Sequence, residues 1–521
     1  MNQDIISALL LPSAYPEPTD HVELKQTHIS YLFLTKDFVY KVKKGVNFGF
    51  LDFTTLEQRQ HFCEEEVRLN TRLCPGMYLG VAHICLSAGG IKINGPGTVI
   101  EYAVKMLRLP ADRMLNRMLD AQQVSTPEIR EVARRIAEFH CALPTNVDIA
   151  QFGEPRAIAE NWNDNISQLR SGSIPPNFSA DLDRIDTWGQ NFLILNDQLL
   201  QRRVADGYIR ECDGDIHSEN ICLTDPVRIF DCIEFNSRFR YSDTAADLAF
   251  LLMDLDFHRR SDLATVAVDE YTAITGDEAC RELLPFYKVY RALIRAKVEA
   301  LRSMDPECHE GDRRQAAQQA LAYLRLARGL TLRPNTPATL FMLCGLMGCG
   351  KSTLAEALAY ELGCQILRSD LIRKELAGVS PTTTVRTDFR SGLYDPEMTR
   401  LTYANMAARA EEALTREQSV IVDASFTDPC YRGEFIAIAQ RCRVRCYLLY
   451  LAGSDSLHYE RLQARTARGN DVSDGRVELF AAQKQSFIPP AAGAGIITLD
   501  ASETLDNQLQ TAYLAIAGTA Q

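Results

Sequence analysis

A glycine-rich segment in the last third of the chain has the residue types and the spacing that bind the phosphates of a nucleotide. It reads GLMGCGKS, from Gly345 to Ser352, and fits the pattern GxxxxGK[ST]. Glycines let the backbone wrap around phosphates and direct N–H groups at them, and the positive end of a following helix adds to the attraction. Lys351 is predicted to bridge the β- and γ-phosphates of ATP, and the Ser352 hydroxyl to ligate Mg²⁺. The predicted nucleotide-binding residues are Gly345, Gly348, Cys349, Gly350, Lys351, Ser352 and Thr353.

Two charged residues follow the next apolar segment. Asp370 and Arg373 lie in RSDLIRKEL, directly after CQIL. An acidic side chain at the carboxyl end of a parallel strand points into the crevice where substrates bind. Asp370 is therefore predicted to accept the proton of an attacking hydroxyl, while Arg373 holds the substrate or a phosphate. The alternative is that Asp370 caps the N-terminus of the next helix, a role that is compatible with catalysis.

Further acids and arginines follow the later apolar segments. Asp423 ends VIVD, where its carboxylate is placed to hold Mg²⁺ through water or to orient a substrate, and Arg432 lies on the helix expected after it. Arg465 and Arg468 occur with Arg461 in HYERLQARTARGNDVSD, at spacings that put them roughly on one helical face. A solvated basic stripe is the alternative. We favour a mobile lid that brings positive charge to the transition state.

A second group of acids lies in the first half of the chain. The segment DGDIHSEN holds Asp215 and Asn220, and Asp231 ends the strand that follows, RIFD. Asp215 is predicted to take the proton from an acceptor hydroxyl, and Asn220 and Asp231 to hold Mg²⁺ through their oxygen atoms.

Lysines and glutamates upstream of this loop complete the second group. A lysine of the strand VYKVKK is expected to reach the ATP phosphates and to pair with a glutamate of the helix FCEEEVRLNTRL. The lysine is Lys41 or Lys43, and the glutamate is Glu66 or Glu65.

The elements that must position these groups differ between two parts of the chain. Residues 339–521 alternate apolar strands with amphipathic helices, which predicts an α/β domain with a parallel sheet covered by helices on both faces. Residues 1–330 are β-rich to about residue 107 and mainly helical over 108–330, the outline of a bilobal, kinase-like α+β domain. Residues 331–338 contain prolines and no hydrophobic periodicity, so we expect a linker there.

Composition limits the class of protein. The chain has 521 residues, of which 46% are hydrophobic and 24% charged, and its formal net charge is −12. This length predicts two or three domains, and no stretch reaches the roughly 18 apolar residues of a membrane helix. The negative charge argues against a surface that coats nucleic acid. The 15 cysteines are scattered, and the N-terminus lacks the basic region of a signal peptide, so we expect reduced thiols and a cytoplasmic protein.

The last third of the chain resembles a group of P-loop kinases that includes phage-type polynucleotide 5′-hydroxyl kinases and zeta-toxin-like kinases. The likeness spans nearly all of residues 340–490 and rests on GLMGCGKSTLA, RSDLIRKEL, VIVDASF and the arginine segment. It implies an AAA-type ATP-binding domain that uses ATP and Mg²⁺. It also implies that Asp370 is the hydroxyl-activating base, and that Lys351, Ser352 and the lid arginines handle phosphate.

The first block resembles the aminoglycoside phosphotransferase-like family, the bacterial relatives of protein kinases, over most of residues 25–300. The likeness rests on IAEFHCALP, DGDIHSEN, FDCIEF and DTAADLAFLLMDL. It implies that Asp247 supports the catalytic loop from a buried helix. Family members normally carry a structural His at the position of Asp213, so this departure puts the activity of the block in doubt without touching Asp215. The order of the two blocks is similar to that of bacterial two-domain phosphotransferase-like and ATP-binding fusions.

Three functions are compatible with these patterns. The first is an ATP-dependent phosphotransferase with a P-loop site and a second kinase-like site. The second is a P-loop kinase regulated by an N-terminal pseudokinase or ligand-sensing module, which the Asp213 substitution favours. The third is a non-kinase ATPase switch, which does not need an acid such as Asp370 beside an acceptor. The expected acceptor is a hydroxyl-bearing small molecule or a nucleic-acid 5′ end, and no membrane partner is expected.

Overall fold

The computed structural model describes the chain except residues 1–2, 50, 173–177, 306–307, 334–336, 381–382, 384–390, 469–475 and 519–521, and except the side chains of residues 3, 466–468 and 517–518. The chain divides into two compact units. The first unit comprises Met1–Ile174 and Ser179–Leu324, and the second comprises Pro175–Phe178 and Arg325–Gln521. Among the described residues, no helix has both the length and the apolar character needed to cross a bilayer.

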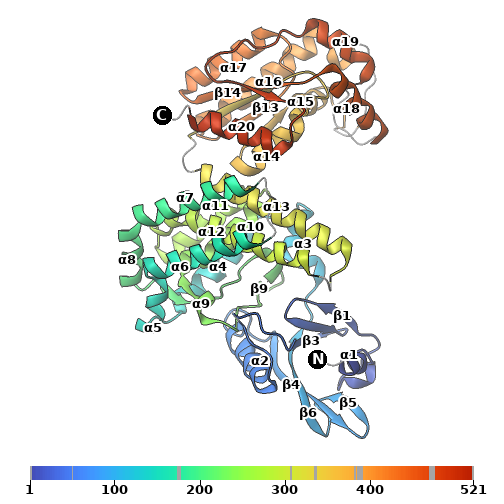
Figure 1. Cartoon of the computed structure of the whole chain (residues 1–521), viewed down its shortest axis with the longest axis vertical. Helices are drawn as coiled ribbons and strands as arrows, with labels where there is room; N and C mark the ends of the chain where they lie inside the picture. Colours follow the sequence, from blue (N-terminus) through green and yellow to red (C-terminus); the bar gives the residue numbers. More distant parts are fainter. Residues whose placement is uncertain are drawn as a thin grey trace. The chain divides into compact units, whose positions relative to one another are not determined.

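The first unit opens with a six-stranded antiparallel sheet of order β1-β2-β3-β6-β4-β5 (Figure 1). Tyr40 and Val42 of β3 pack into an apolar cluster on one face. Because side chains alternate along a strand, Lys41 and Lys43 project from the other face. The strands are β1 (Glu23–Gln26), β2 (Ser30–Leu34), β3 (Phe38–Lys43), β4 (Tyr78–Ser87), β5 (Gly90–Ile93) and β6 (Thr98–Leu107).

Helix α2 (Leu56–Asn70) covers the face of the sheet that carries the two lysines. It begins with a capping box, because the Thr55 side chain accepts from the backbone N–H of Gln58 and the Gln58 side chain accepts from that of Thr55. Cys63 of α2 packs with Val104 of β6 in one apolar cluster. This packing brings the acidic side of α2 over β3.

Helices form most of the rest of the first unit. Every residue from Thr244 to Asp256 of α10 is buried, so α10 is its central helix, packed on α11 and α12. The helices are α1 (Gln3–Leu9), α3 (Leu115–Asp120), α4 (Thr126–Ala142), α5 (Val147–Ala150), α6 (Pro155–Ser171), α7 (Ser179–Leu195), α8 (Asp197–Ala205), α9 (Ser237–Arg240), α10 (Thr244–Phe257), α11 (Ser261–Thr275) and α12 (Cys280–Met304). Two antiparallel pairs of short strands accompany them: β7 (Ile209–Glu211) with β10 (Tyr241–Asp243), and β8 (Ile221–Cys222) with β9 (Arg228–Ile229).

The second unit contains a five-stranded parallel sheet of order β12-β13-β11-β14-β15. All six residues of β11 are buried, and they alternate between two apolar clusters. Leu340, Met342 and Cys344 pack with α15, α16 and α17, whereas Phe341 and Leu343 pack with α14 and α20. The predicted parallel sheet with helices on both faces is therefore confirmed.

The elements of the second unit follow the predicted alternation of strands and helices. The strands are β11 (Thr339–Cys344), β12 (Gln365–Arg368), β13 (Val420–Asp423), β14 (Arg445–Ala452) and β15 (Ile496–Asp500). The helices are α14 (Lys351–Leu362), α15 (Ser369–Leu376), α16 (Pro396–Thr415), α17 (Pro429–Cys442), α18 (Asp455–Arg468), α19 (Val477–Ser486) and α20 (Leu505–Gly518).

The boundary between the units lies earlier than the prolines suggest. It falls between Leu324 and Arg325, inside helix α13 (Glu310–Leu332), whereas the sequence predicts a first domain to residue 330 and a linker over 331–338. Just beyond this division, Arg328 of α13 donates to both carboxylate oxygens of Glu361 in α14, a buried ion pair within the second unit. The last turns of α13 therefore belong to the second unit, and residues 334–336 lie outside the described part of the chain.

Replacing Arg328 with Met should destabilise the second unit by about 3 kcal/mol, because breaking a buried ion pair leaves the other charge uncompensated. Glu361 is fully buried. We expect the double variant Arg328→Met/Glu361→Gln to recover part of the loss. The measurement is urea unfolding followed by far-UV circular dichroism. Trp162 and Trp188 are the two tryptophans of the chain and both lie in the first unit, so their fluorescence separates its unfolding from that of the second.

The matched control is Arg314→Met on the same helix. Arg314 is exposed and pairs with exposed Glu310, so its loss should shift neither transition measurably. An Arg328→Met variant as stable as this control would contradict the assignment of α13 to the second unit's core.

Candidate functional site

The turn after β11 has the backbone geometry of a phosphate cradle. Gly345, Gly348 and Gly350 have φ angles of 147°, 79° and 101°, which side chains with a Cβ rarely adopt. A Cβ on Gly345 would also lie 2.8 Å from the carbonyl oxygen of Leu451. Helix α14 begins directly after this turn, at Lys351, so its unpaired N–H groups face the loop.

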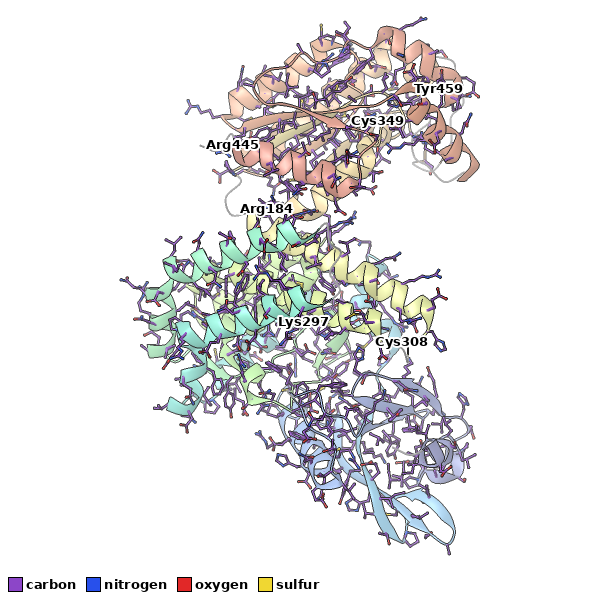
Figure 2. All side chains as sticks on the ribbon, viewed as in Figure 1. Arg184, Lys297, Cys308, Cys349, Arg445 and Tyr459 are labelled. Carbon is purple, nitrogen blue, oxygen red and sulfur yellow. The ribbon has the colours of Figure 1, made fainter. Side chains whose placement is uncertain are left out.

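The lysine of the motif closes the turn. Lys351 Nζ donates to the main-chain oxygens of Gly345 and Leu346, both at 2.9 Å, and lies 3.6 Å from Cys349 Sγ. Cys349, labelled in Figure 2, is fully buried. Thr353 is exposed in the first turn of α14. The predicted nucleotide-binding residues thus lie in one loop and one helical turn.

The predicted magnesium ligands of this unit are in direct contact. Ser352 Oγ donates to Asp423 Oδ2 at 2.7 Å, and Arg368 Nε lies 3.8 Å from the same oxygen. Burial raises the pKa of Asp423, and Asp370 adds to the rise, whereas Lys351, Ser352 and Arg368 oppose it. A hydroxyl beside a carboxylate suits a hard cation such as Mg²⁺. Their role as ligands stays a prediction.

Asp370 does not cap its helix. The N-cap of α15 is Arg368, which makes no side-chain cap, and Asp370 is the second residue of the helix. Its Oδ1 accepts from Arg373 at 3.1 Å and from the Tyr394 hydroxyl at 3.4 Å. The Arg373 guanidinium stacks 4.5 Å from the centre of the Tyr394 ring. Because the Asp370 charge acts on Asp423, the predicted base lies in the same electrostatic environment as the cradle.

Helix α18 contacts the cradle through Arg461, one of the three arginines of the predicted lid segment. Arg461 donates to the main-chain oxygens of Cys349 at 3.0 Å and Ala501 at 2.8 Å. Arg465 lies one turn further along α18, and the side chain of Arg468 lies outside the described residues. The structure therefore gives Arg461 a defined contact with the loop and leaves the roles of Arg465 and Arg468 as predictions.

Two residues that sequence reasoning missed hold the cradle through the backbone of Met347. His458 Nδ1 lies 2.9 Å from the Met347 carbonyl oxygen, and Gln483 Oε1 accepts from the Met347 N–H at 2.9 Å. Burial lowers the pKa of His458, so a neutral ring donates through Nδ1. The spacing from His458 to Arg461 put both on one helical face, a usable signal, whereas nothing local to α19 marked Gln483.

In the first unit, the two lysines of β3 share one glutamate of α2. Lys41 Nζ lies 2.8 Å from Glu66 Oε1, and Lys43 Nζ lies 2.7 Å from Glu66 Oε2. Lys41 also contacts Asp231 Oδ1 at 2.5 Å, and Lys43 contacts Glu234. Burial alone would raise the pKa of Glu66, but the two lysines outweigh it and lower the pKa to about 2. Both candidate lysines therefore pair with Glu66, and Lys41 also contacts Asp231.

The alternative glutamate is excluded from this cluster. Glu65 points to the outside of α2, where it pairs with Arg68 at 2.7 Å. Lys43, the alternative lysine, is fully buried and held by Glu66 and Glu234, so Lys41 is the lysine that reaches toward Asp231.

The acidic loop of the first unit folds around Asp215. Asn220 Nδ2 donates to Asp215 Oδ2 at 3.0 Å and to its main-chain oxygen at 3.1 Å. His217 Nε2 lies 3.4 Å from Asp215 Oδ2. Burial raises the pKa of Asp215, but His217 and nearby arginines outweigh it, so its pKa is lowered. The carboxylate predicted to act as a base is therefore ionised and hydrogen-bonded to Asn220.

A buried aspartate of α10 holds this loop in place. Asp247 accepts from the backbone N–H groups of Asp213 at 3.0 Å and Gly214 at 2.8 Å, and lies 3.0 Å from His140 Nε2. Asp213 is itself buried, and its Oδ1 accepts from the Asp215 N–H at 3.1 Å. Burial, and then the charge of Asp247, raise the pKa of Asp213 well above its ordinary value. These surroundings therefore favour the protonated form of the Asp213 carboxyl.

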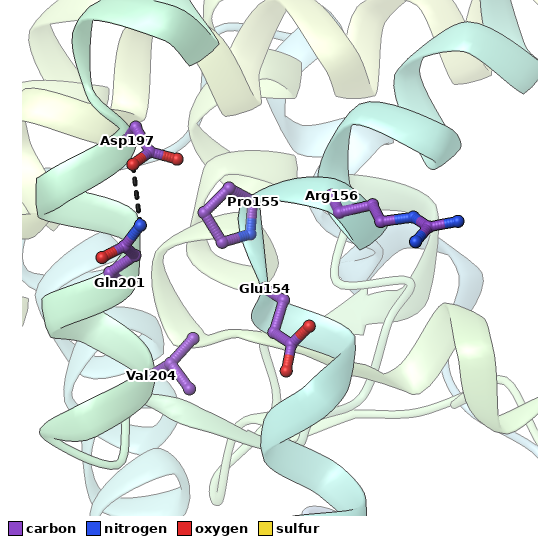
Figure 3. A pocket seen from close by; sticks show the side chains of 6 residues that line it. All are labelled: Glu154, Pro155, Arg156, Asp197, Gln201 and Val204. Carbon is purple, nitrogen blue, oxygen red and sulfur yellow. Dashed lines mark hydrogen bonds between the residues drawn. The ribbon is translucent and has the colours of Figure 1, made fainter.

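A depression of about 440 Å³ on the first unit lies apart from all these residues (Figure 3). Among its lining residues, Gln201 donates a hydrogen bond of 2.7 Å to Asp197. Arg156 points away from the other labelled side chains. It is lined by Glu154, Pro155, Arg156, Asp197, Gln201 and Val204. No convergent group of chemistry-bearing side chains lines it.

Replacing Asp213 with Asn should stabilise the first unit at pH 8 and change it little near pH 4. A carboxyl whose pKa is raised on folding contributes stability below its unfolded pKa, near 3.8, and loses that contribution as the pH rises toward the folded value. An amide binds no proton, so the variant lacks this loss. The measurement is urea unfolding followed by tryptophan fluorescence between pH 4 and pH 8. Asp183→Asn, at an exposed position of α7, is the control, and parallel curves for wild type and Asp213→Asn would rule out a protonated Asp213.

Comparisons with known proteins agree with a nucleotide-binding second unit. Residues 340–490 match a family model described as an AAA domain. Among solved structures, a gluconokinase from Sinorhizobium meliloti is 22% identical, covering 35% of this chain and 94% of its own, with a TM-score of 0.27. Amicoumacin kinase hAmiN is 13% identical, covering 62% of this chain and 93% of its own, with a TM-score of 0.38. Neither TM-score reaches 0.5, so neither likeness supports an inference about activity.

Two mycobacterial relatives match nearly the whole chain. They are the uncharacterized proteins Rv2004c of Mycobacterium tuberculosis and Mb2027c of Mycobacterium bovis. Each is 30% identical over 462 residues, which cover 88% of this chain and 89% of the relative. The match is too long to be confined to either unit. The chain therefore belongs to the same family as the mycobacterial protein Rv2004c.

Proposed function

We propose that the chain is an ATP-dependent phosphotransferase whose P-loop site transfers the γ-phosphate of ATP to a hydroxyl group. The observation that carries the proposal is the 2.7 Å hydrogen bond from Ser352 to Asp423. It sets a hydroxyl and a carboxylate, two ligand types of Mg²⁺, beside the glycine turn and Lys351. The match of residues 340–490 to an AAA domain supports nucleotide binding there.

Asp370 is the proposed general base. It accepts the proton of the acceptor hydroxyl while the hydroxyl oxygen bonds to the γ-phosphorus, and the bond from that phosphorus to the β–γ bridging oxygen breaks to release ADP. Arg373, 3.1 Å from Asp370, holds the carboxylate in place, and Lys351 stabilises the charge on the phosphates. Mg²⁺ bound by Ser352 and Asp423 would neutralise part of that charge. Arg465 and Arg468 are the proposed lid residues.

We propose a second phosphotransfer site in the first unit, which gives that unit a kinase-like role. The specific observation in its favour is that Lys41 joins Glu66 to Asp231, so the predicted phosphate-binding lysine and a predicted metal ligand meet. Asp215 would act as its base, and Asn220 and Asp231 would hold Mg²⁺.

Two alternatives predict different behaviour. A P-loop kinase with a regulatory first unit would bind nucleotide or a metabolite there without transferring phosphate. An ATPase switch would hydrolyse ATP without an acceptor, and then Asp370 would have no proton to accept. The acceptor of the proposed kinase is a hydroxyl-bearing small molecule or a nucleic-acid 5′ end.

Replacing Asp370 with Asn should preserve Mg-ATP binding and lower transfer to an acceptor by about 100-fold or more, the scale of losing a general base. The measurement is transfer of labelled γ-phosphate to a metabolite and RNA pool, beside calorimetry with Mg-ATP. Glu375→Gln is the matched control, because Glu375 is on the same helix and pairs with Arg409 at the surface. A transfer rate equal to that of the control would remove Asp370 from the mechanism, whereas ATP hydrolysis by wild type with no label on any acceptor would favour the ATPase switch.

Replacing Lys351 with Ala should remove most ATP turnover of the full chain, because the ammonium stabilises charge on the phosphates. Asp215→Ala should remove only the part contributed by the first unit. If turnover survives Lys351→Ala and Asp215→Ala abolishes it, the main site is in the first unit.

Calorimetry of the Lys351→Ala chain tests whether the first unit has a nucleotide site of its own. Residual Mg-ATP binding that disappears when Lys41→Met is added supports the proposed site of the first unit. The absence of binding at millimolar nucleotide excludes that site.

A further inference from the structure

Two buried arginines of the second unit have donor groups that the proposed transfer step does not use. Arg373 of α15 is 6% exposed and Arg432 of α17 is 7% exposed. Within the described part of the chain, the Nε–H group of each lacks a hydrogen-bond acceptor. Polar groups at this depth are nearly always paired, and arginine stays charged in proteins. Each residue therefore offers an unused donor on a full positive charge.

The contacts that Arg432 does make are with a neutral group. Its guanidinium donates to the main-chain oxygen of Ile488. Across the described ranges, no carboxylate lies within the 4.0 Å of an ion pair with it. On the same helix, Arg441 is exposed and pairs with Glu411 at 2.8 Å. Burying a cation without a counter-charge is costly, so the buried arginine, unlike the exposed one, calls for an anion that the described part of the chain does not provide.

The helices that carry the two arginines, α15 and α17, pack with α16 on the same face of the sheet. Tyr403 of α16 accepts from the Phe426 N–H at 3.2 Å and stacks on Tyr431, the residue before Arg432, with ring centres 3.9 Å apart. Burial raises the pKa of Tyr403 and Arg373 opposes the rise. Burial also raises the pKa of Cys344 at the end of β11, and Arg432 and then Lys351 oppose it.

We infer that Arg432 and Arg373 form an anion-binding subsite for the acceptor, so that the substrate of the P-loop site carries a phosphate, sulfate or carboxylate group as well as its hydroxyl. The inference rests on the proposed function of that site. Arg373 also contacts Asp370, so a bound anion is placed beside the base that would activate the hydroxyl. Arginine presents several N–H donors in a fixed fork that matches such anions.

The direct test is titration of inorganic sulfate into the full chain saturated with Mg-AMP-PNP, which fills the phosphate cradle. Wild type should bind sulfate, and Arg432→Gln and Arg373→Gln should each weaken the binding by about tenfold or more, the scale of a hydrogen bond to a charged group. Arg432→Lys keeps the charge but not the forked N–H donors, so its sulfate affinity should lie between those of wild type and Arg432→Gln. Equal sulfate affinity in wild type and Arg432→Gln, or no sulfate binding by wild type, overturns the inference.

The matched control is Arg441→Gln, which removes an arginine from the same helix without touching the proposed subsite. It should bind sulfate as wild type does. Far-UV circular dichroism and Mg-AMP-PNP affinity show whether the buried variants fold. A variant that has lost AMP-PNP binding is replaced in the comparison by Arg432→Lys.

A second, independent experiment tests the acceptor itself. A metabolite pool separated by anion exchange into neutral and anionic fractions is offered to the enzyme with labelled ATP. Label should appear in the anionic fraction and not in the neutral one, and phosphatase treatment beforehand separates phosphorylated from carboxylated acceptors. Label in the neutral fraction alone overturns the inference. Label in neither fraction counts against the proposed kinase function, and the sulfate titration then decides the subsite.

Discussion

The buried carboxylate of Asp423 is the interaction on which the geometry of the second unit's site depends. It ends a central strand, and the hydrogen bond from Ser352 ties it to the first turn of α14. That bond requires α14 to start close to the end of β13. The chain reaches this position only through glycines with φ angles that other residues avoid. The same constraint directs the unpaired N–H groups of α14, the ammonium of Lys351 and a carboxylate at one point, which is the requirement for binding phosphate together with a hard cation.

In the first unit, ion pairs rather than a backbone turn hold the charged side chains of the site in position. Its lysines and glutamates are buried between β3, α2 and the segment after β9, where a lone charge would be costly. Glu66 serves both lysines, one with each oxygen, and a second acid supports each lysine: Asp231 for Lys41 and Glu234 for Lys43. Fully paired networks of this kind fix side-chain positions. Lys43 is thus a support that orients Glu66, and Lys41 is the member with access to Asp231.

Local sequence signals predicted the parts of this structure that local rules determine. The strand, glycine turn and helix of the second unit follow from residue types that are close together in the sequence, and α14 begins directly after the glycine turn, as the motif predicts. The division between the two units inside α13 could not be predicted, because the prolines near residue 335 are visible in the sequence, whereas the pair of Arg328 with Glu361 joins two helices. For the same reason Gln483 could not be assigned to Met347. Strand alternation placed Lys41 and Lys43 on one face but could not rank them, since only the tertiary partners differ.

Asp213 in the acidic loop has a smaller effect on charge than its residue type suggests. Burial, and then the charge of Asp247, raise the pKa of Asp213 well above its ordinary value, which favours the protonated, neutral carboxyl. A neutral acid can accept from the Asp215 N–H, as it does at 3.1 Å, without adding to the charge of the loop. Asp247 then remains the ionised partner that organises the loop through two backbone N–H groups and His140. A protonated Asp213 would add no charge to the loop, so the difference between a kinase and a pseudokinase would depend on the residues proposed for the site, Asp215, Asn220 and Lys41.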